Sequence, residues 1–127
     1  MTKRKLVYIA SPLAGEVEKN QQFARDACRF AVERGMTPIA SHLLFPQFLK
    51  DEVPAERELG IKMGLQLVGA ADELWVCGDK ISPGMQAEIA RAEQLGIPIR
   101  SISRKEIQQG FGLLERQKAK GGKRNAR

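Results

Sequence analysis

The residue that most clearly invites chemistry is a glutamate within the apolar stripe of a predicted helix. The apolar residues of that stripe, which recur at helical spacing, are Met85, Ile89 and Ala92. Glu88 falls inside the stripe, whereas Glu93 lies off it. Burying a carboxylate costs several kcal/mol unless the group is paired or neutral, so Glu88 is a candidate catalytic group. The alternative is a glutamate at the rim of the stripe that pairs with Arg91 or with a charge on another element.

The same helix begins with a motif that could hold an anion. Ser82 precedes Pro83, and a capping serine followed by proline is typical of a helix start. Gly84 allows a ligand to approach the backbone closely, and the first N–H groups of a helix, here around Met85, attract negative charge. Caps of this kind also begin many helices that bind nothing.

Two further segments carry polar groups that could line a site. The first predicted strand is followed by Ser11, Pro12 and Gly15, in a loop with neither a Walker A nor a Gly-x-Gly-x-x-Gly pattern. Classical binding of nucleoside triphosphates or dinucleotides is therefore disfavoured. The second segment, 41–49, holds the only histidine, His42, beside aromatic residues. An aromatic wall with a few polar tips suits a planar ring such as a nucleobase, although a lone histidine is more often structural.

These groups must be positioned by alternating strands and helices. Short apolar runs predict strands at residues 5–10, 36–40, 72–77 and 97–101, and helical spacing predicts helices at residues 18–34, 54–69, 82–95 and 103–109. This alternation predicts a single Rossmann-like, flavodoxin-like three-layer α/β domain. We expect a parallel sheet of four or five strands in the order 2-1-3-4, with any fifth strand at the end. The crevice between the loops 11–17 and 77–84 is the expected ligand site, because strand order reverses there.

Charge separates this domain, residues 1–112, from a basic tail, residues 113–127. The chain of 127 residues has a net charge of +6 from 21 basic and 15 acidic residues. The last acid is Glu115, and removing the six basic residues that follow it leaves 15 basic against 15 acidic ones. The Gly- and Lys-rich end of the tail, residues 118–127, has no large apolar side chain to bury, so we expect it to be disordered. It is either a solubilising terminus or the one place where nucleic acid could bind.

Several other classes are disfavoured by what the sequence contains. No apolar run is long enough for a membrane span and no signal-type segment is present, so we expect a cytoplasmic protein without a membrane partner. Cys28 and Cys77 lack neighbours at metal-ligand spacing. We therefore expect buried thiols, no disulfide, no metal site and no cofactor.

Together these segments resemble a known superfamily over about residues 5–101. The matching motifs are residues 8–12 (Tyr-Ile-Ala-Ser-Pro), 71–76 (Ala-Asp-Glu-Leu-Trp-Val), 82–90 (Ser-Pro-Gly-Met-Gln-Ala-Glu-Ile-Ala) and 95–99 (Leu-Gly-Ile-Pro-Ile). They resemble the nucleoside 2-deoxyribosyltransferase superfamily, which includes the deoxynucleoside 5'-monophosphate N-glycosidases. The segment 41–49 is most similar to small relatives in that group.

The resemblance implies roles for individual residues. Glu88 corresponds to the nucleophile that attacks C1' of the deoxyribose, and Tyr8 to the tyrosine that orients it. Ser11 and Ser82 correspond to serines that hold a 5'-phosphate in the hydrolases, although the first loop lacks the arginine that accompanies serine there. The remaining substrate-binding candidates are Pro12, Gly15, His42, Phe45, Gln47, Asp72, Gly84 and Met85.

The implied activity is that of an N-glycoside hydrolase or deoxyribosyltransferase, acting on a 2'-deoxynucleoside or its 5'-monophosphate through a glutamate nucleophile. Members of the superfamily complete each active site with a neighbouring subunit, so a homo-oligomer with a shared site is expected. The alternative is a non-catalytic protein that senses or sequesters a nucleotide or another metabolite on the same fold.

Overall fold

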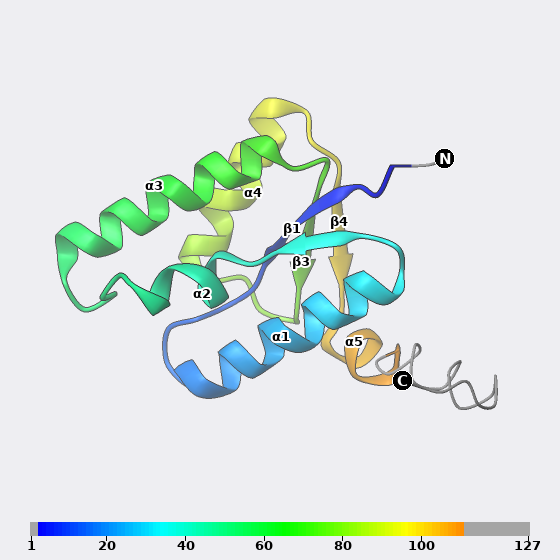
Figure 1. Ribbon diagram of the computed structural model, residues 1–127, viewed down its shortest axis with the longest axis horizontal. Coiled ribbons are helices and arrows are strands. Elements are labelled where there is room, and N and C mark those ends of the chain that lie inside the picture. The colour runs from blue at the N-terminus through cyan, green and yellow to red at the C-terminus, as the bar shows by residue number, and fades with distance from the viewer. Residues whose placement is uncertain (1–2, 111–127) are drawn as a thin grey trace, which may run out of the picture.

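Four parallel strands form the sheet of the computed structural model, which describes residues 3–110 (Figure 1). The strands are β1 (Leu6–Ala10), β2 (Thr37–Ile39), β3 (Glu73–Cys77) and β4 (Ile99–Ile102). Their order is β2-β1-β3-β4, which confirms the predicted order, and residues 3–110 contain no fifth strand. The predicted disorder of residues 113–127 falls outside the described residues.

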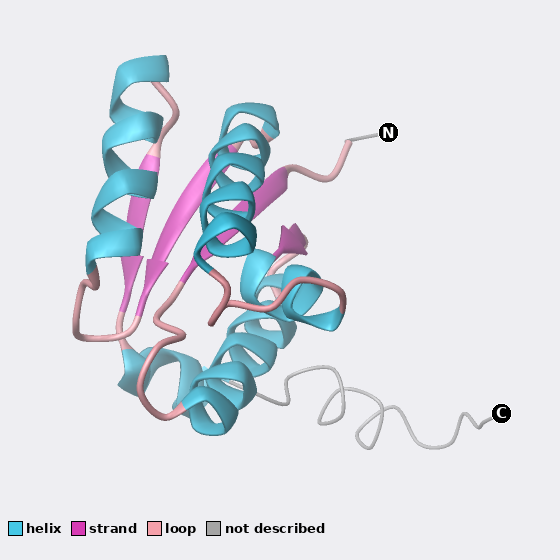
Figure 2. Ribbon diagram, turned by 90° about the vertical axis from the view of Figure 1, so that its left-hand side faces the viewer, coloured by secondary structure: helices cyan, strands magenta, loops and turns pink. Residues whose placement is uncertain are grey.

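Helices cover both faces of the sheet and make a three-layer α/β fold (Figure 2). The helices are α1 (Val17–Glu33), α2 (Ser41–Leu44), α3 (Pro54–Ala70), α4 (Pro83–Leu95) and α5 (Arg104–Gly110), with a 3-10 helix, η1 (Phe45–Gln47), after α2. The core on one face joins the strands to α1 and α5, and the core on the other joins them to α3 and α4. None of the described helices is long and apolar enough to cross a membrane.

The alternation of side chains along β1 explains its unbroken apolar sequence. Val7 and Ile9 pack against α1 and α5, whereas Tyr8 and Ala10 belong to the core beneath α3 and α4. Successive side chains of a strand point to opposite faces, so a strand covered on both sides is apolar throughout. The phenol of Tyr8 thereby lies on the face where α4 carries Glu88.

The register between strands places a second polar residue on that face. Tyr8 is paired with Ile39 of β2 and with Leu74 of β3. Ser41 follows Ile39 by two positions, and the chain is still extended at Ala40, with φ −126° and ψ 111°. The side-chain period of two therefore turns Ser41 towards the same face as Tyr8.

The ends of α4 match the expected stop and start signals. The Ser82 hydroxyl accepts a hydrogen bond from the backbone N–H of Met85 at 3.2 Å, and Pro83 occupies the first turn. Gly96 ends the helix in the left-handed conformation, with φ 71°, where glycine carries little strain. The cap fixes where α4 starts, and so how far along it Glu88 stands.

Most of the segment 41–49 is helical, since η1 follows α2 directly. Pro46 lies in the first turn of η1, where a proline fits because its missing N–H is not needed. Both cysteines are free thiols; Cys77 is buried and Cys28 is partly buried.

Candidate active site

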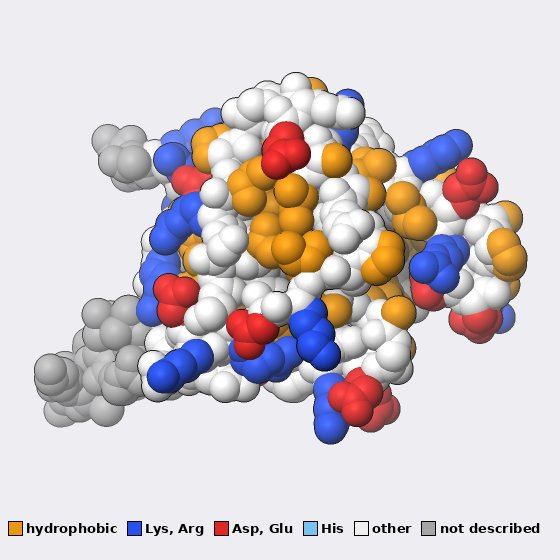
Figure 3. Space-filling model, turned by 180° about the vertical axis from the view of Figure 1, so that it is seen from behind, with side chains coloured by type: hydrophobic (Ala, Val, Ile, Leu, Met, Phe, Trp, Pro, Cys, Tyr) orange, Lys and Arg blue, Asp and Glu red, His pale blue; other side chains and the backbone are white. Residues whose placement is uncertain are grey.

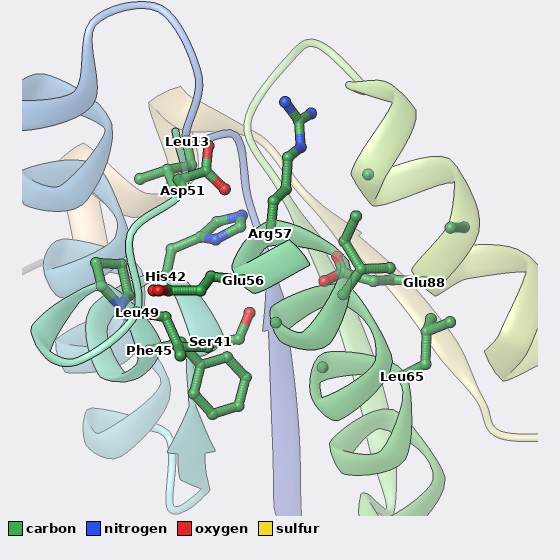
Figure 4. A pocket seen from close by; sticks show the side chains of 16 residues that line it. Leu13, Ser41, His42, Phe45, Leu49, Asp51, Glu56, Arg57, Leu65 and Glu88 are labelled. Carbon is green, nitrogen blue, oxygen red and sulfur yellow. The ribbon is translucent and has the colours of Figure 1, made fainter. Parts of the chain in front are cut away.

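The candidate site is a pocket at the carboxyl edge of the sheet, on the side of α3 and α4 (Figure 4). Its wall comes from the loop after β1, from α2 and η1, from the first half of α3 and from the start of α4. The lining residues are Leu13, Ser41, His42, Phe45, Pro46, Leu49, Asp51, Glu56, Arg57, Gly60, Ile61, Gly64, Leu65, Gly84, Ala87 and Glu88. The pocket therefore shares Leu13 and Gly84 with the two loops expected to form it, while segment 41–65 contributes most of the rest.

Glu88 reaches the pocket wall and is held from behind by a tyrosine. Its carboxylate oxygen Oε2 accepts a hydrogen bond from the Tyr8 hydroxyl at 2.5 Å, and both side chains are buried. The other oxygen, Oε1, has no hydrogen-bond partner among residues 3–110. No salt bridge from Arg91 to Glu88 occurs, and Arg91 donates instead to Gln94. The carboxylate is thus held through one oxygen, while the other is buried without a hydrogen-bond partner among the described residues.

Burial and hydrogen bonding act in opposite directions on this carboxylate. Burial raises the pKa of Glu88 from its ordinary 4.5 to about 7, and the hydrogen bond from Tyr8 lowers it in part. Burial and the neighbouring Glu88 raise the pKa of Tyr8 above its usual 10.0, so the phenol keeps its proton. Glu88 therefore changes charge near neutral pH, while Tyr8 remains a donor.

A glycine of α3 brings that helix close to the pair. A Cβ atom placed on Gly64 would lie 3.3 Å from the Tyr8 hydroxyl and 3.9 Å from Glu88 Oε2. The first of these distances is tighter than ordinary van der Waals contact. A side chain at this position would crowd the two groups, so Gly64 keeps the space around the carboxylate open.

The opposite side of the pocket combines an imidazole with apolar side chains. Burial lowers the pKa of His42 below its ordinary 6.5, an effect that the backbone of Ser11 and the charge of Asp51 partly offset. The imidazole is therefore neutral at neutral pH. Figure 4 shows it beside Asp51 and across the pocket from Glu88, with Leu49 and Phe45 nearby. A neutral hydrogen-bonding ring in an apolar wall can recognise a flat heterocycle.

Charged groups stand where α3 begins. Glu56 accepts a hydrogen bond from the backbone N–H of Lys50 at 2.6 Å, which fixes its carboxylate. Asp51 contributes a second carboxylate, and Arg57 is the one cationic side chain among the described lining residues. Acidic side chains thus outnumber basic ones at this pocket.

The predicted phosphate-binding serines lie near the pocket but do not line it. The Ser82 hydroxyl is occupied as acceptor for the Met85 N–H, whereas Ser11 is buried and its Oγ has no partner among residues 3–110. Pro83 has no N–H and the cap takes that of Met85, so Gly84 supplies the remaining N–H of the first turn. Of this group Gly84 alone belongs to the wall.

Other predicted binding residues lie away from this pocket. Asp72 precedes β3 at the amino end of the strand, opposite the pocket, where its carboxylate accepts from the backbone N–H of Leu6 at 2.8 Å. Gln47 is exposed and donates to the carbonyl of Leu43. The other three predicted residues lie in the loop after β1 or in the core. Pro12 and Gly15 belong to the loop outside the wall, and Met85 is buried against the sheet.

Most of the lining residues were not among the site residues predicted from the sequence, and three of them bear directly on the chemistry. Ser41 and Gly64 lie beside Tyr8, and Arg57 adds the positive charge. A signal existed for Ser41, because it stands two residues beyond Ile39 in the strand pattern. Residues 3–110 contain no group of three or more His, Cys, Asp or Glu side chains placed to hold a metal ion.

Two solved structures with this fold are 2-deoxyribosyltransferases. That of Bacillus psychrosaccharolyticus superposes with a TM-score of 0.64 at 21% identity, covering 77% of this chain and 72% of the other. That of Leishmania mexicana superposes with a TM-score of 0.54 at 16% identity, covering 78% of this chain and 64% of the other. The chain thus has the α/β fold of the 2-deoxyribosyltransferases, as the sequence motifs suggested.

The family to which this chain belongs is identified by its sequence. Residues 5–102 match the family model described as Domain of unknown function (DUF7768), and the chain belongs to this family. No curated protein sequence matches it. The matched range begins just before β1 and ends with β4, so it includes every strand of the sheet and every residue that lines the pocket.

Proposed function

We propose that the protein is an enzyme that cleaves the N-glycosidic bond of a 2'-deoxynucleoside or its 5'-monophosphate, with Glu88 as nucleophile. The observation that carries the proposal is the buried carboxylate of Glu88, a residue of the pocket wall, which is held by Tyr8 and has one oxygen without a partner among residues 3–110. The fold shared with two 2-deoxyribosyltransferases supports the same class of reaction.

The chemistry needs few groups. An oxygen of Glu88 attacks C1' as the bond from C1' to the base nitrogen breaks, and the base leaves with the bonding electron pair. The developing positive charge on the sugar is stabilised by the carboxylate. Water then hydrolyses the glycosyl ester, or a second base takes the sugar. The apolar wall around Phe45 and the neutral imidazole of His42 suit the departing base.

The protonation of Glu88 predicts the pH dependence of this reaction. A nucleophilic carboxylate must be ionised, and the pKa of Glu88 is raised to about 7 by burial. We expect kcat/KM to rise with pH through about 7 and then to level off.

The direct test is to incubate the protein with a panel of deoxynucleosides and their monophosphates and to measure the release of free base by chromatography. We expect Glu88→Gln to lower the rate by about 1,000-fold or more, because the amide cannot form the glycosyl ester. Glu93→Gln is the matched control, since Glu93 is an exposed acid of the same helix. The absence of release from every substrate, or a Glu88→Gln protein as active as its parent, would contradict the proposal. Tight binding without turnover would instead support the non-catalytic alternative.

The choice between nucleoside and monophosphate depends on charge. A phosphate monoester would have Arg57 and the N–H of Gly84 as donors at the wall, but would approach Asp51 and Glu56 as well. We propose that the sugar lies between Glu88 and the start of α3, where either substrate can enter. Rates on paired substrates that differ only in the phosphate decide between them.

A homo-oligomer with a shared site is part of the same proposal. Large apolar side chains on α3 and α4 that are nearly half exposed are Leu59, Ile61 and Leu95. Figure 3 shows apolar side chains gathered near the centre of the face opposite to that seen in Figure 1. Light scattering of the purified protein tests this expectation. The cytoplasmic location stays a prediction.

A further inference from the structure

A buried hydroxyl, that of Ser41, lies beside the Tyr8–Glu88 pair and takes no direct part in the proposed attack. The Oγ atom of Ser41 is 2.8 Å from the Tyr8 hydroxyl oxygen, and Ser41 is 6% exposed. The Tyr8 hydroxyl in turn lies 2.5 Å from Glu88 Oε2. Three side chains from β1, from the residue that opens α2, and from α4 therefore form one chain of hydrogen bonds.

The direction of this chain follows from counting protons. A phenol has one proton, and Tyr8 donates it to the Glu88 carboxylate. The oxygen of Tyr8 can then only accept, so the bond from Ser41 must be donated by the serine. A phenol that accepts a hydrogen bond becomes a better donor, because bonds in a chain polarise one another.

We propose that Ser41 is a positioning residue, whose hydroxyl orients and polarises Tyr8 so that Glu88 is held ionised and aimed at the substrate. This inference rests on the proposed function for its catalytic meaning. The contact with Ser41 lowers the pKa of Tyr8, against the larger upward effects of burial and Glu88, which agrees with a serine that donates to the phenol oxygen.

The position of Ser41 is fixed by the backbone. Ser41 is the first residue of α2 and directly follows β2, which pairs with β1 through Ile39 and Tyr8. On the other side, a Cβ atom at Gly64 would lie 3.8 Å from the Ser41 Oγ. The sheet and α3 thus leave the hydroxyl little freedom to turn away from Tyr8.

Apart from Tyr8, no titratable or charged group among the described residues forms a hydrogen bond with the Glu88 side chain. The titratable and charged groups around it are Tyr8 from β1, His42 from α2, Asp51 from the segment before α3, and Glu56 and Arg57 from α3. Tyr8 is the one whose interaction changes the pKa of Glu88, beside burial. A change at Ser41 should therefore reach Glu88 through Tyr8.

The experiment is a double-mutant cycle read by the titration of Glu88 itself. The carboxyl signal of Glu88 is followed by 13C NMR against pH in the parent, Ser41→Ala, Tyr8→Phe and the double variant, and is assigned by its loss in Glu88→Gln. We expect Tyr8→Phe to raise the pKa of Glu88 by about 1 pH unit or more. Ser41→Ala should raise it by about 0.3 to 0.5 pH unit in the parent and by nothing in the Tyr8→Phe background.

Companion variants separate this role from a structural one. Ser41→Thr keeps the hydroxyl and should keep the parent pKa, whereas Ser41→Cys, with its weak S–H donor, should give a smaller rise than alanine. The cysteine variant carries the test if Ser41→Ala does not fold. Ser101→Ala, at an exposed serine of β4, is the control for an unrelated loss of a hydroxyl. A Glu88 pKa that is unchanged in Ser41→Ala and Ser41→Cys, or an equal rise with and without Tyr8, would overturn the proposal.

The titration is independent of turnover, so its outcome is distinct from that of the proposed function. If base release is found, the acid limb of the kcat/KM profile should move upward by the same 0.3 to 0.5 pH unit in Ser41→Ala. If no substrate is turned over but the titration shifts, the hydrogen-bond chain stands and the catalytic assignment falls.

Discussion

Replacing Glu88 with glutamine should stabilise the protein above neutral pH but not at about pH 4. Burial raises the pKa of the Glu88 carboxyl from 4.5 to about 7 in the folded chain. Linkage converts this difference between folded and unfolded states into about 3 kcal/mol, at about 1.4 kcal/mol for each pH unit. Glu88 is 9% exposed, so solvent screening reduces the value little.

The sign follows from which state holds the proton. Below about pH 4.5 the carboxyl is protonated in both states and costs nothing extra. As the pH rises from 4.5 to about 7, the unfolded chain ionises first, so the parent loses stability across this window. Above about 7 the whole penalty is present. Glu88→Gln has no such titration, and its advantage over the parent should grow with pH.

The cost of burying the glutamine amide reduces the gain in unfolding free energy by the same amount at every pH. Glutamine can accept the Tyr8 hydrogen bond, but its amide nitrogen takes the place of Oε1, which has no partner among the described residues. An unsatisfied buried donor costs about 1 kcal/mol or more at every pH. We therefore expect the variant to be slightly less stable at about pH 4 and about 2 kcal/mol more stable at about pH 8.

Guanidinium unfolding at a series of pH values measures this difference. The single tryptophan, Trp75, is 1% exposed in the core and reports unfolding by its fluorescence. His42 and Glu73 also have shifted pKa values, but they titrate alike in both proteins and cancel in the difference. Glu93→Gln, which replaces an exposed acid of the same helix, is the control. A Glu88→Gln difference that does not change with pH would refute the reasoning.

Three further changes test the geometry of the pocket and its surroundings. Gly60→Ala should raise the unfolding free energy by up to about 1 kcal/mol, because the added Cβ would contact only Leu49, at 3.7 Å. Gly64→Ala should instead lower it by about 1 kcal/mol or more in the same unfolding assay. Asp72→Ala should lower the unfolding free energy by about 1 kcal/mol and leave base release unchanged; a large loss of activity would restore Asp72 to the site. Arg57→Ala should lower kcat/KM by about tenfold or more for a monophosphate and little for the nucleoside, and equal losses in both rates would exclude phosphate binding by Arg57.

The sheet order could be predicted because short apolar runs alternate along the chain with helices whose starts and ends are marked by proline and glycine. Residues 6–10 are apolar throughout, as a strand covered on both faces must be, and Gly96 marks the end of α4. Glu88 could be singled out because the helical stripe depends only on local sequence. Local patterns thus predicted both the elements and the carboxylate that one of them carries.

The partners of Glu88 could not be predicted in the same way. Ser41 contacts Tyr8 because β2 and β1 pair in one particular register. Gly64 lies beside both residues because of where α3 packs on the sheet. Neither fact is written in a local pattern. For Asp72 the family motif suggested a binding role. Its position just before a parallel strand places it at the edge of the sheet away from the pocket.

The energetics of Glu88 distinguish a functional residue from a packing one. An apolar residue at position 88 would complete the stripe of Met85, Ile89 and Ala92 without any charge to bury. A carboxylate there costs the fold about 3 kcal/mol above neutral pH, and the hydrogen bond from Tyr8 offsets only part of the effect of burial. Proteins retain such destabilising groups mainly at sites where they act on a ligand. The buried hydroxyls that hold this carboxylate, and the glycine that leaves room for it, are what a site would need to keep an unfavourable charge aimed into a pocket.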